Sequence, residues 1–467
     1  MRRPVSNHLA PRVVLRDAPS QELSGSSGRT GVVQFCLRPI YRVVHCIPEG
    51  GLSISTQGPP SPAPDRIRTL DLIRGVAVLG ILAVNITSFA APTSANYAPD
   101  MPNPGGLADH ILFGIKLLFF EGKMRALFSM LFGVSLLLFI DRASHAGRDG
   151  VALQVRRLCW LALFGYLHFL LLWSGDILFI YAVSGLVALV FRRASPKSMI
   201  VSALLLFTVW QSWNYSQWQS DLSAESAMAA STASPAQTKS NAENAIFFRQ
   251  QDSDDLAVNN NSWSGLVAYK LREKAYMPLI GVFFVMGETL TYILFGMALL
   301  NSGFFAGAWR PARLRALAGG GIGGGGLATL AFIGWNVRHN YPPIEMRFAI
   351  DYGLSFAHLA MALGYLALLV LLAARLLATR IGCRVEATGR MAFSNYIGTS
   401  LVMTGIFYGW GLGLFGQFGE AARHGFVLLG WILMLAWSQP WLTRYRQGPL
   451  EWLWRSLTEW RVLGLRR

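Results

Sequence analysis

The feature that most constrains this chain is the recurrence of long apolar runs. From Leu70 onward the sequence returns again and again to stretches that carry almost no charge. Many of them reach about 20 residues, which is the length an α-helix needs to cross the hydrocarbon core of a bilayer. Lipid offers no partners to backbone N–H and C=O groups, so such runs fold as helices. The sequence therefore predicts an all-α, polytopic integral membrane bundle.

The apolar runs divide the chain into regions. We predict ten transmembrane helices, at residues 70–91, 124–140, 157–173, 177–192, 198–213, 277–300, 314–336, 350–377, 388–410 and 424–442. A shorter apolar stretch, 109–120, either lies on the interface or extends the second helix through a break. Five helices fall in an N-terminal half, 66–213, and five in a C-terminal half, 277–467. The polar segment between them, 214–276, is predicted to be an extracytoplasmic loop that is largely mobile.

The charges indicate how the helices are oriented. The chain has 41 Lys+Arg against 25 Asp+Glu, yet only 14% of its residues are charged. The basic residues gather in alternate short gaps between apolar runs, as the positive-inside rule requires. We therefore expect a multi-pass protein of the bacterial inner membrane with both termini in the cytoplasm. Its first partner is the lipid bilayer, and this pattern argues against a nucleic-acid partner.

Two further features lie outside this pattern. Residues 1–65 are rich in Arg, Pro, Ser and Gly without a sustained period, which predicts a disordered cytoplasmic leader. The four cysteines, Cys36, Cys46, Cys159 and Cys383, are scattered and form no CxxC pair. We therefore predict neither a disulfide framework nor a metal site.

Polar side chains inside apolar runs are costly, so they are the first candidates for function. Asn85 lies in the outer part of the first helix, and His168 lies mid-helix among Leu and Phe. Asp176 follows Gly175 at the turn between the third and fourth helices, where it suits an N-cap. His168 and Asp176 are about 12 Å apart along a helical rise, so we expect no direct contact. We predict that Asn85, His168 and Asp176 face one outward-opening cavity, with Tyr181 about one turn below Asp176. The alternative for each is an ordinary interhelical hydrogen bond.

A second group of polar residues suits substrate binding. Glu121, Lys123 and Arg125 crowd into five positions, either as a solvated interfacial turn or as a cationic pocket with Glu121 as its counter-charge. Glu288 and His358 lie inside other apolar runs and pair with each other or with polar groups of the first half.

Three further polar residues lie at the inner ends of helices or along a polar stripe. Arg74 lies near the cytoplasmic end of the first helix, and Arg390 near that of the ninth, where Asn395 belongs to a polar stripe.

The run GGGIGGGG at 319–326 lacks the strand and the Lys-Ser or Lys-Thr of a phosphate loop. Close helix packing explains it better.

Five ordered segments resemble a known family. They are TLDLIRGVAVLGILAVNI, FEGKMRALFSMLFG, LLLWSGDILFIYAVSG, GRMAFSNYIGTSLVMTGIFYGWGLGLFG and GPLEWLWRSLT. They resemble the successive signatures of the YeiB-like inner-membrane proteins of bacteria (domain of unknown function 418). A more distant likeness is to membrane acyltransferases, whose first helix also opens with an Arg-Gly step and carries a polar residue about three turns on. That residue is typically His in the type-three enzymes, whereas this chain has Asn85. The resemblance implies an acyltransferase-like helical bundle around a cavity.

Two functions follow as hypotheses. In the first, an acyl donor such as acetyl-CoA enters from the cytoplasm and its phosphates meet Arg74, Arg156, Arg157 and Arg390. His168 is then the general base, and Asn85 or Tyr181 donates a hydrogen bond to the developing oxyanion.

In the second hypothesis, the protein transports or flips a small or lipid-linked solute. Substrate or protons are then bound by Glu288, His168 and Asp176.

Overall fold

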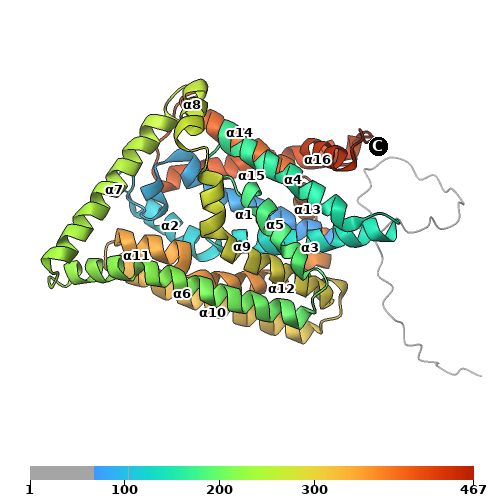
Figure 1. Cartoon of the computed structure of the whole chain (residues 1–467), viewed down its shortest axis with the longest axis horizontal. Coiled ribbons are helices and arrows are strands. Elements are labelled where there is room, and N and C mark those ends of the chain that lie inside the picture. The colour runs from blue at the N-terminus through green and yellow to red at the C-terminus, as the bar shows by residue number, and fades with distance from the viewer. Residues whose placement is uncertain (1–67, 104) are drawn as a thin grey trace, which may run out of the picture. The chain divides into compact units, whose positions relative to one another are not determined.

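The computed structural model of the protein describes residues 68–103 and 105–467, so the predicted leader at 1–65 lies outside the described residues. Helices make up the regular structure of the described part (Figure 1). The prediction of an all-α bundle is thus confirmed.

The helices of the first half and of the middle segment follow one another with short connections. They are α1 (Arg68–Ala90), η1 (Thr93–Asn96), α2 (Leu107–Phe119), α3 (Lys123–His145), α4 (Gly150–Leu171), α5 (Leu178–Ala188), η2 (Leu189–Phe191), α6 (Pro196–Ala229), α7 (Pro235–Asn259) and α8 (Trp263–Glu273).

The second half continues in the same manner. Its elements are α9 (Met277–Asn301), η3 (Phe304–Ala306), α10 (Pro311–Arg338), α11 (Pro343–Phe348), the π-helix η4 (Ala349–Gly353), α12 (Ser355–Leu377), α13 (Arg380–Arg390), α14 (Ala392–Phe407), α15 (Glu420–Arg444) and α16 (Pro449–Glu459).

Local sequence signals account for several of the helix starts. The side chain of Asp149 accepts the backbone N–H groups of Val151 and Ala152 at the start of α4. Ser195 caps α6 in the same way and is followed by Pro196, whose missing N–H costs nothing at the first helical position. Ser234 forms a capping box with Gln237 at the start of α7.

Six helical segments of the described chain are long and apolar enough to cross a membrane: α1, α2–α3 together, α9, α10, α12 and α15. A seventh apolar segment, Leu178–Phe191, is shorter. The predicted α4 and α6 spans and the span at 388–410 form helices without meeting the same measure. The prediction of a polytopic membrane protein is therefore supported, but the count of ten is not confirmed.

Two predicted spans have different boundaries in the structure. The run at 350–377 begins as the π-helix η4, and α12 starts only at Ser355. The run at 388–410 is divided between α13 and α14, with a break at Met391.

The stretch 109–120 forms the separate helix α2, and Gly122 breaks the chain before α3 with a φ of 70°.

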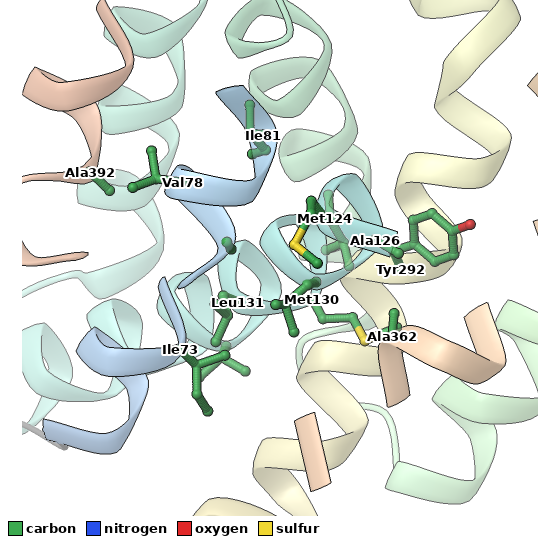
Figure 2. Packing of buried hydrophobic residues seen from close by; sticks show 14 of the residues in the cluster. Ile73, Val78, Ile81, Met124, Ala126, Met130, Leu131, Tyr292, Ala362 and Ala392 are labelled. Carbon is green, nitrogen blue, oxygen red and sulfur yellow. The ribbon is translucent and has the colours of Figure 1, made fainter. Parts of the chain in front are cut away.

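Helix α1 lies at the centre of the packing. It contacts α3, α12, α13, α14 and α15. Figure 2 shows side chains of α1 in one buried cluster with residues of α3 and α14; Ile73 is drawn near Leu131 of α3 and Val78 near Ala392 of α14. Glycine permits the closest crossing: a Cβ on Gly75 would lie 2.0 Å from the carbonyl oxygen of Val385 on α13. Small residues at such crossings let membrane helices approach.

The glycine run of α10 allows close helix packing only at some of its positions. Gly321 and Gly325 face the backbone of α12, where an added Cβ would lie 2.4 Å and 2.6 Å from carbonyl oxygens. Helices α10 and α12 lie side by side (Figure 1). Gly319, Gly320 and Gly323 instead have no protein atom within 4 Å of the place a Cβ would take. The predicted packing role therefore applies to one face of the run.

The segment 214–276, which we expected to be a mobile loop, is helical over most of its length. Helix α6 continues to Ala229, and α7 and α8 follow with Ser caps (Figure 1). Asp255 of α7 accepts the backbone N–H and the hydroxyl of Thr93 at 2.9 and 2.7 Å. Polarity alone therefore misled the prediction, because capped polar sequences also form helices when their ends are held.

Candidate functional site

His168 and Asp176 are in direct contact, which corrects the expectation that they would stay apart. The Nδ1 atom of His168 lies 2.8 Å from Oδ1 of Asp176, and both side chains are almost completely buried. The chain reverses direction between the end of α4 at Leu171 and the start of α5 at Leu178. A distance measured along one helical rise therefore does not apply. Asp176 also accepts the N–H of Phe179 at 2.9 Å, which fixes its carboxylate at the start of α5.

The second ring nitrogen of His168, Nε2, differs from Nδ1 in its hydrogen bonding. Its Nε2 atom is buried and has no hydrogen-bond partner among the described residues. With Asp176 accepting from Nδ1, a neutral imidazole places its lone pair on Nε2. Asp176 thus selects the tautomer that leaves Nε2 free to accept a proton, as the carboxylate does in Ser-His-Asp enzymes.

Aromatic rings enclose this pair. The ring of His168 lies 5.3 Å from that of Tyr396 on α14 and 6.2 Å from that of Trp173. Trp173 stacks on Phe89 of α1 at 4.1 Å. The C-terminal end of α1 and the α4–α5 turn are therefore neighbours.

Asn85 lies near this group but not on the same surface. It lines a small hollow of about 10 Å³ together with Phe89, Tyr396 and Ser400, which is room for about one water molecule. Tyr396 is common to both groups, since it lines this hollow and its ring packs on His168. The common outward-opening cavity for Asn85, His168 and Asp176 stays a prediction.

A much larger cavity, of about 640 Å³, opens among α1, α3, α4, α5, α13, α14 and α16. The apolar and aromatic part of its lining, which we call its inner end, includes Phe128, Ile177, Tyr181 and Tyr396. Ile177 directly follows Asp176 in the chain. The inner end of the cavity thus includes the chain neighbour of Asp176, and neither His168 nor Asp176 is among the lining residues.

The remaining lining of this cavity is strongly basic. Seven arginines face it against two glutamates, Glu451 and Glu459; the arginines are Arg74, Arg142, Arg148, Arg157, Arg390, Arg446 and Arg455. Apart from Arg74, these arginines come from, or border, the gaps that the positive-inside rule assigns to the cytoplasm. An excess of positive charge in a concave site favours an anionic ligand.

Several of these arginines are held in place by neighbours. Arg157 lies over the rings of Phe139 and Trp454, at 4.7 and 4.1 Å. Arg74 donates to Asp71 at 2.8 Å and to Ser135 at 2.9 Å. Such contacts orient the guanidinium groups before a ligand arrives.

Helix α16 covers one side of the cavity and brings both glutamates. The hydrogen bond from Arg148 lowers the pKa of Glu459, and the same bond raises the pKa of Arg148. Burial raises the pKa of Glu451, although hydrogen bonds from Ser394 and from the N–H groups of Phe393 and Ser394 oppose this. Glu451 thereby caps the start of α14, the helix that carries Tyr396.

The predicted substrate-binding group at the α2–α3 turn forms a separate cluster. Arg125 pairs with Glu288 at 2.6 Å rather than with Glu121, and Tyr292 donates to Glu288. Lys123 is fully buried and donates to the carbonyl oxygen of Leu117 at 2.6 Å. His358, which we considered as a partner of Glu288, packs against Gly122, and neither of its ring nitrogens has a partner among the described residues.

The other predicted residues have varied surroundings. The Tyr181 hydroxyl accepts from Ser129 at 3.0 Å and lies 3.5 Å from the carbonyl oxygen of Arg125. Asn395 is buried, donates to Thr388 and Ser438 and accepts from Trp437, so its polar atoms are occupied within the bundle. Arg156 donates to the carbonyl oxygen of Thr458 and is not among the cavity-lining residues.

Sequence reasoning missed Tyr396, Glu451 and the arginines of the C-terminal segment as site residues. The available signal for Tyr396 was its place in the polar stripe SNYIGTS. For the arginines it was their accumulation after α15, which we used only to orient the chain. No group of three or more His, Cys, Asp or Glu suited to a metal ion occurs within residues 68–103 and 105–467.

Comparison with known proteins places this arrangement in a family. Residues 299–461 match the family described as "Protein of unknown function (DUF418)". The chain is 31% identical over 410 residues to "Uncharacterized protein YxaH" of Bacillus subtilis (strain 168), covering 84% of this chain and 94% of that protein. It is 28% identical over 418 residues to "Uncharacterized protein YeiB" of Escherichia coli (strain K12), covering 84% of this chain and 96% of that protein.

No solved structure matches the chain. The likeness to membrane acyltransferases is not shown by these comparisons. The near-complete alignment with bacterial relatives, the matching family segment and the membrane-crossing helices agree with the five sequence signatures. The chain therefore belongs to the YeiB-like DUF418 family of bacterial membrane proteins.

Proposed function

We propose that this protein is a membrane-bound acyltransferase. It takes an acyl group from a phosphorylated thioester donor, of which acetyl-CoA is the simplest, and passes it to a hydroxyl or amine of an acceptor. The observation that carries the proposal is the position of the His168–Asp176 pair, with its unpartnered Nε2, beside the inner end of an arginine-lined cavity.

The cavity suits such a donor in size and charge. Ligand sites commonly measure about 300–1,000 Å³, so 640 Å³ is ample for a large part of a nucleotide-containing molecule. Guanidinium groups bind phosphate through paired, charge-assisted hydrogen bonds. The apolar inner end suits the uncharged arm of the donor, which would carry the thioester toward Tyr396 and His168.

Apart from the donor and the acceptor, the acyl transfer needs only side chains that are present at the site. The acceptor hydroxyl or amine attacks the thioester carbonyl while Nε2 of His168 accepts its proton. The new C–O or C–N bond forms as the C–S bond breaks, and the imidazolium returns the proton to the departing thiolate. Asp176 stabilises the imidazolium through Nδ1 at 2.8 Å. The products are the acylated acceptor and free thiol.

The transport alternative has weaker support. Its central residue, Glu288, is engaged by Arg125 and Tyr292, so it is not a free carboxylate awaiting a proton or a solute. Asp176 is likewise engaged, by Nδ1 of His168 and the N–H of Phe179. A donor-binding cavity with a histidine beside it is better matched to group transfer.

Purified protein in lipid nanodiscs, supplied with radiolabelled acetyl-CoA and a bacterial membrane extract, tests the proposal. We expect protein-dependent transfer of the label together with release of free thiol. His168→Ala should reduce the rate by about 100-fold or more, the usual contribution of a general base. The matched control is His339→Ala, because His339 is exposed at the end of α10.

Two results would count against the enzyme. One is a wild-type protein that neither transfers nor hydrolyses the donor at any extract concentration. The other is a His168→Ala variant with the same rate as His339→Ala. Solute counterflow by the same protein in sealed vesicles would then favour the transporter.

A further inference from the structure

Tyr396 lies where three parts of the site meet. It is on α14, one turn after the Glu451 contacts with Phe393 and Ser394. Its side chain lines the inner end of the arginine-lined cavity and also the small hollow that Asn85 lines. Its ring is 5.3 Å from the ring of His168. Tyr396 therefore contacts both the cavity and the ring of His168.

The hydroxyl of Tyr396 has one contact within the protein, in which it acts as acceptor. The backbone N–H of Ile177 donates to it at 3.4 Å. Among the hydrogen bonds of the described residues, none has this hydroxyl as the donor. A buried O–H normally finds an acceptor, so its proton is available to a ligand at this point.

The other candidates for the same task are less suited. The hydroxyl of Tyr181 accepts from Ser129 and faces the carbonyl oxygen of Arg125, an acceptor within the protein. Asn85 lines the small hollow and is not among the residues that line the cavity. Of these three, Tyr396 alone combines contact with the cavity, proximity to His168 and an unused proton.

We infer that Tyr396 is a catalytic residue that donates its hydroxyl hydrogen bond to the acyl carbonyl oxygen as negative charge develops there. The inference rests on the proposed function. The N–H of Ile177, donating to the phenol oxygen, polarises the O–H bond and strengthens it as a donor. Because Ile177 follows Asp176, one turn of chain orients both the base and the oxyanion donor.

The test is Tyr396→Phe in the full-length protein in nanodiscs, assayed by steady-state transfer from acetyl-CoA. The ring that packs on His168 remains and only the hydroxyl is lost. Removing one oxyanion donor typically lowers kcat by about 100-fold or more. We expect that loss in kcat, with a KM for acetyl-CoA within about twofold of wild type.

Tyr365→Phe is the matched control, because its hydroxyl donates to the carbonyl oxygen of Phe119 and lies outside the cavity. It should keep wild-type kcat.

Tyr396→Gln guards against a folding defect, since its amide restores a donor without the ring. Per folded protein, judged by thermal melting, it should transfer faster than Tyr396→Phe.

The outcomes separate the two proposals. A wild-type enzyme that transfers acetyl groups equally well with Tyr396→Phe overturns the role of Tyr396 and leaves the proposed function standing. A Tyr396→Phe variant that loses kcat only in proportion to its folded fraction does the same. A wild-type protein without any transfer or hydrolysis overturns both.

Discussion

At the residue scale, Gly122 shows how one position fixes a turn inside the bundle. Its φ of 70° is in the left-handed region, and an added Cβ would lie 2.0 Å from Nδ1 of His358. A side chain would therefore meet both backbone strain and a buried ring. Glycine is required here for conformation and for space at once.

We predict that Gly122→Ala destabilises the protein by about 2–5 kcal/mol. The left-handed backbone accounts for about 1–2 kcal/mol, and displacing a packed ring for about 1–3 kcal/mol. Gly319→Ala is the control, because no protein atom lies within 4 Å of its added Cβ. That change should be neutral or stabilise α10 by up to about 1 kcal/mol. Equal effects of the two variants in denaturant titrations would contradict the prediction.

Lys270 of α8 gives a pH dependence with a defined sign. Its ammonium group is buried and donates to the carbonyl oxygen of Phe169 at 2.8 Å, and burial lowers its pKa from 10.5 to about 7. Between pH 7 and 10.5 the unfolded chain therefore binds a proton that the folded chain does not. The free energy of unfolding rises with pH in this window, since the unfolded state binds more protons. Below pH 7 the charged, buried form carries its full cost.

The melting temperature of Lys270→Met should lack this rise between pH 7 and 10. The difference between wild type and variant should therefore shift in favour of wild type as the pH increases. Lys274→Met, in the same segment, is the control and should follow the wild-type curve. Parallel pH curves for wild type and Lys270→Met would show that the Lys270 amine titrates normally.

At the element scale, α7 lacks the buried side chains that anchor a helix to its neighbours. None of its described residues is buried. At its C-terminal end, Asp252 and Asp255 accept from Ser94 and Thr93, and the carbonyl oxygen of Asn259 accepts the N–H of Gly409. Nearer its N-terminal end, two side chains donate to Asp221 of α6; they are Ser240 and Asn244. Because no side chain of α7 is buried, the position of its C-terminal end depends on the few hydrogen bonds made there.

Asp255→Ala should release α7 from η1. Losing both bonds to Thr93 costs about 1–2 kcal/mol net, which raises the open population roughly 5- to 30-fold. Trypsin should then cleave after Arg249 faster by a similar factor. Asp254→Ala removes the same charge from an exposed neighbouring position and should cleave at the wild-type rate. Equal cleavage of the two variants would mean that Asp255 does not hold the helix.

At the scale of the whole molecule, orientation decides which compartment supplies the donor. The arginine-lined cavity belongs to the end of the bundle that the positive-inside rule assigns to the cytoplasm. Acetyl donors would then enter from the cytoplasm, and an acceptor would reach the site from the other side.

Reporter fusions test this orientation. A reporter fused after Pro104 should be active outside the inner membrane, and one after Ala146 should be active in the cytoplasm. The reverse pattern would place the cavity on the outer face and exclude a cytoplasmic donor. Truncation at these points leaves the insertion signals of the preceding apolar helices in place.

The amino-acid sequence by itself determined the class of protein and the position of most helices. Period and length in apolar runs are local properties, so α1, α3, α9, α10 and α15 are near their predicted residues. The five sequence signatures also indicated the family. Local patterns failed at Met391, where the predicted span 388–410 is divided between α13 and α14.

Only the tertiary structure decided which polar residues meet. His168 and Asp176 are eight residues apart, and the chain reversal between α4 and α5 turns an apparent separation into a contact. Tyr396 reaches Ile177 across 219 positions, and Arg125 reaches Glu288 across 163. Helical periodicity fixes the depth and the face of each side chain. Which faces meet depends on the simultaneous packing of all the helices, and no single segment of sequence contains that information.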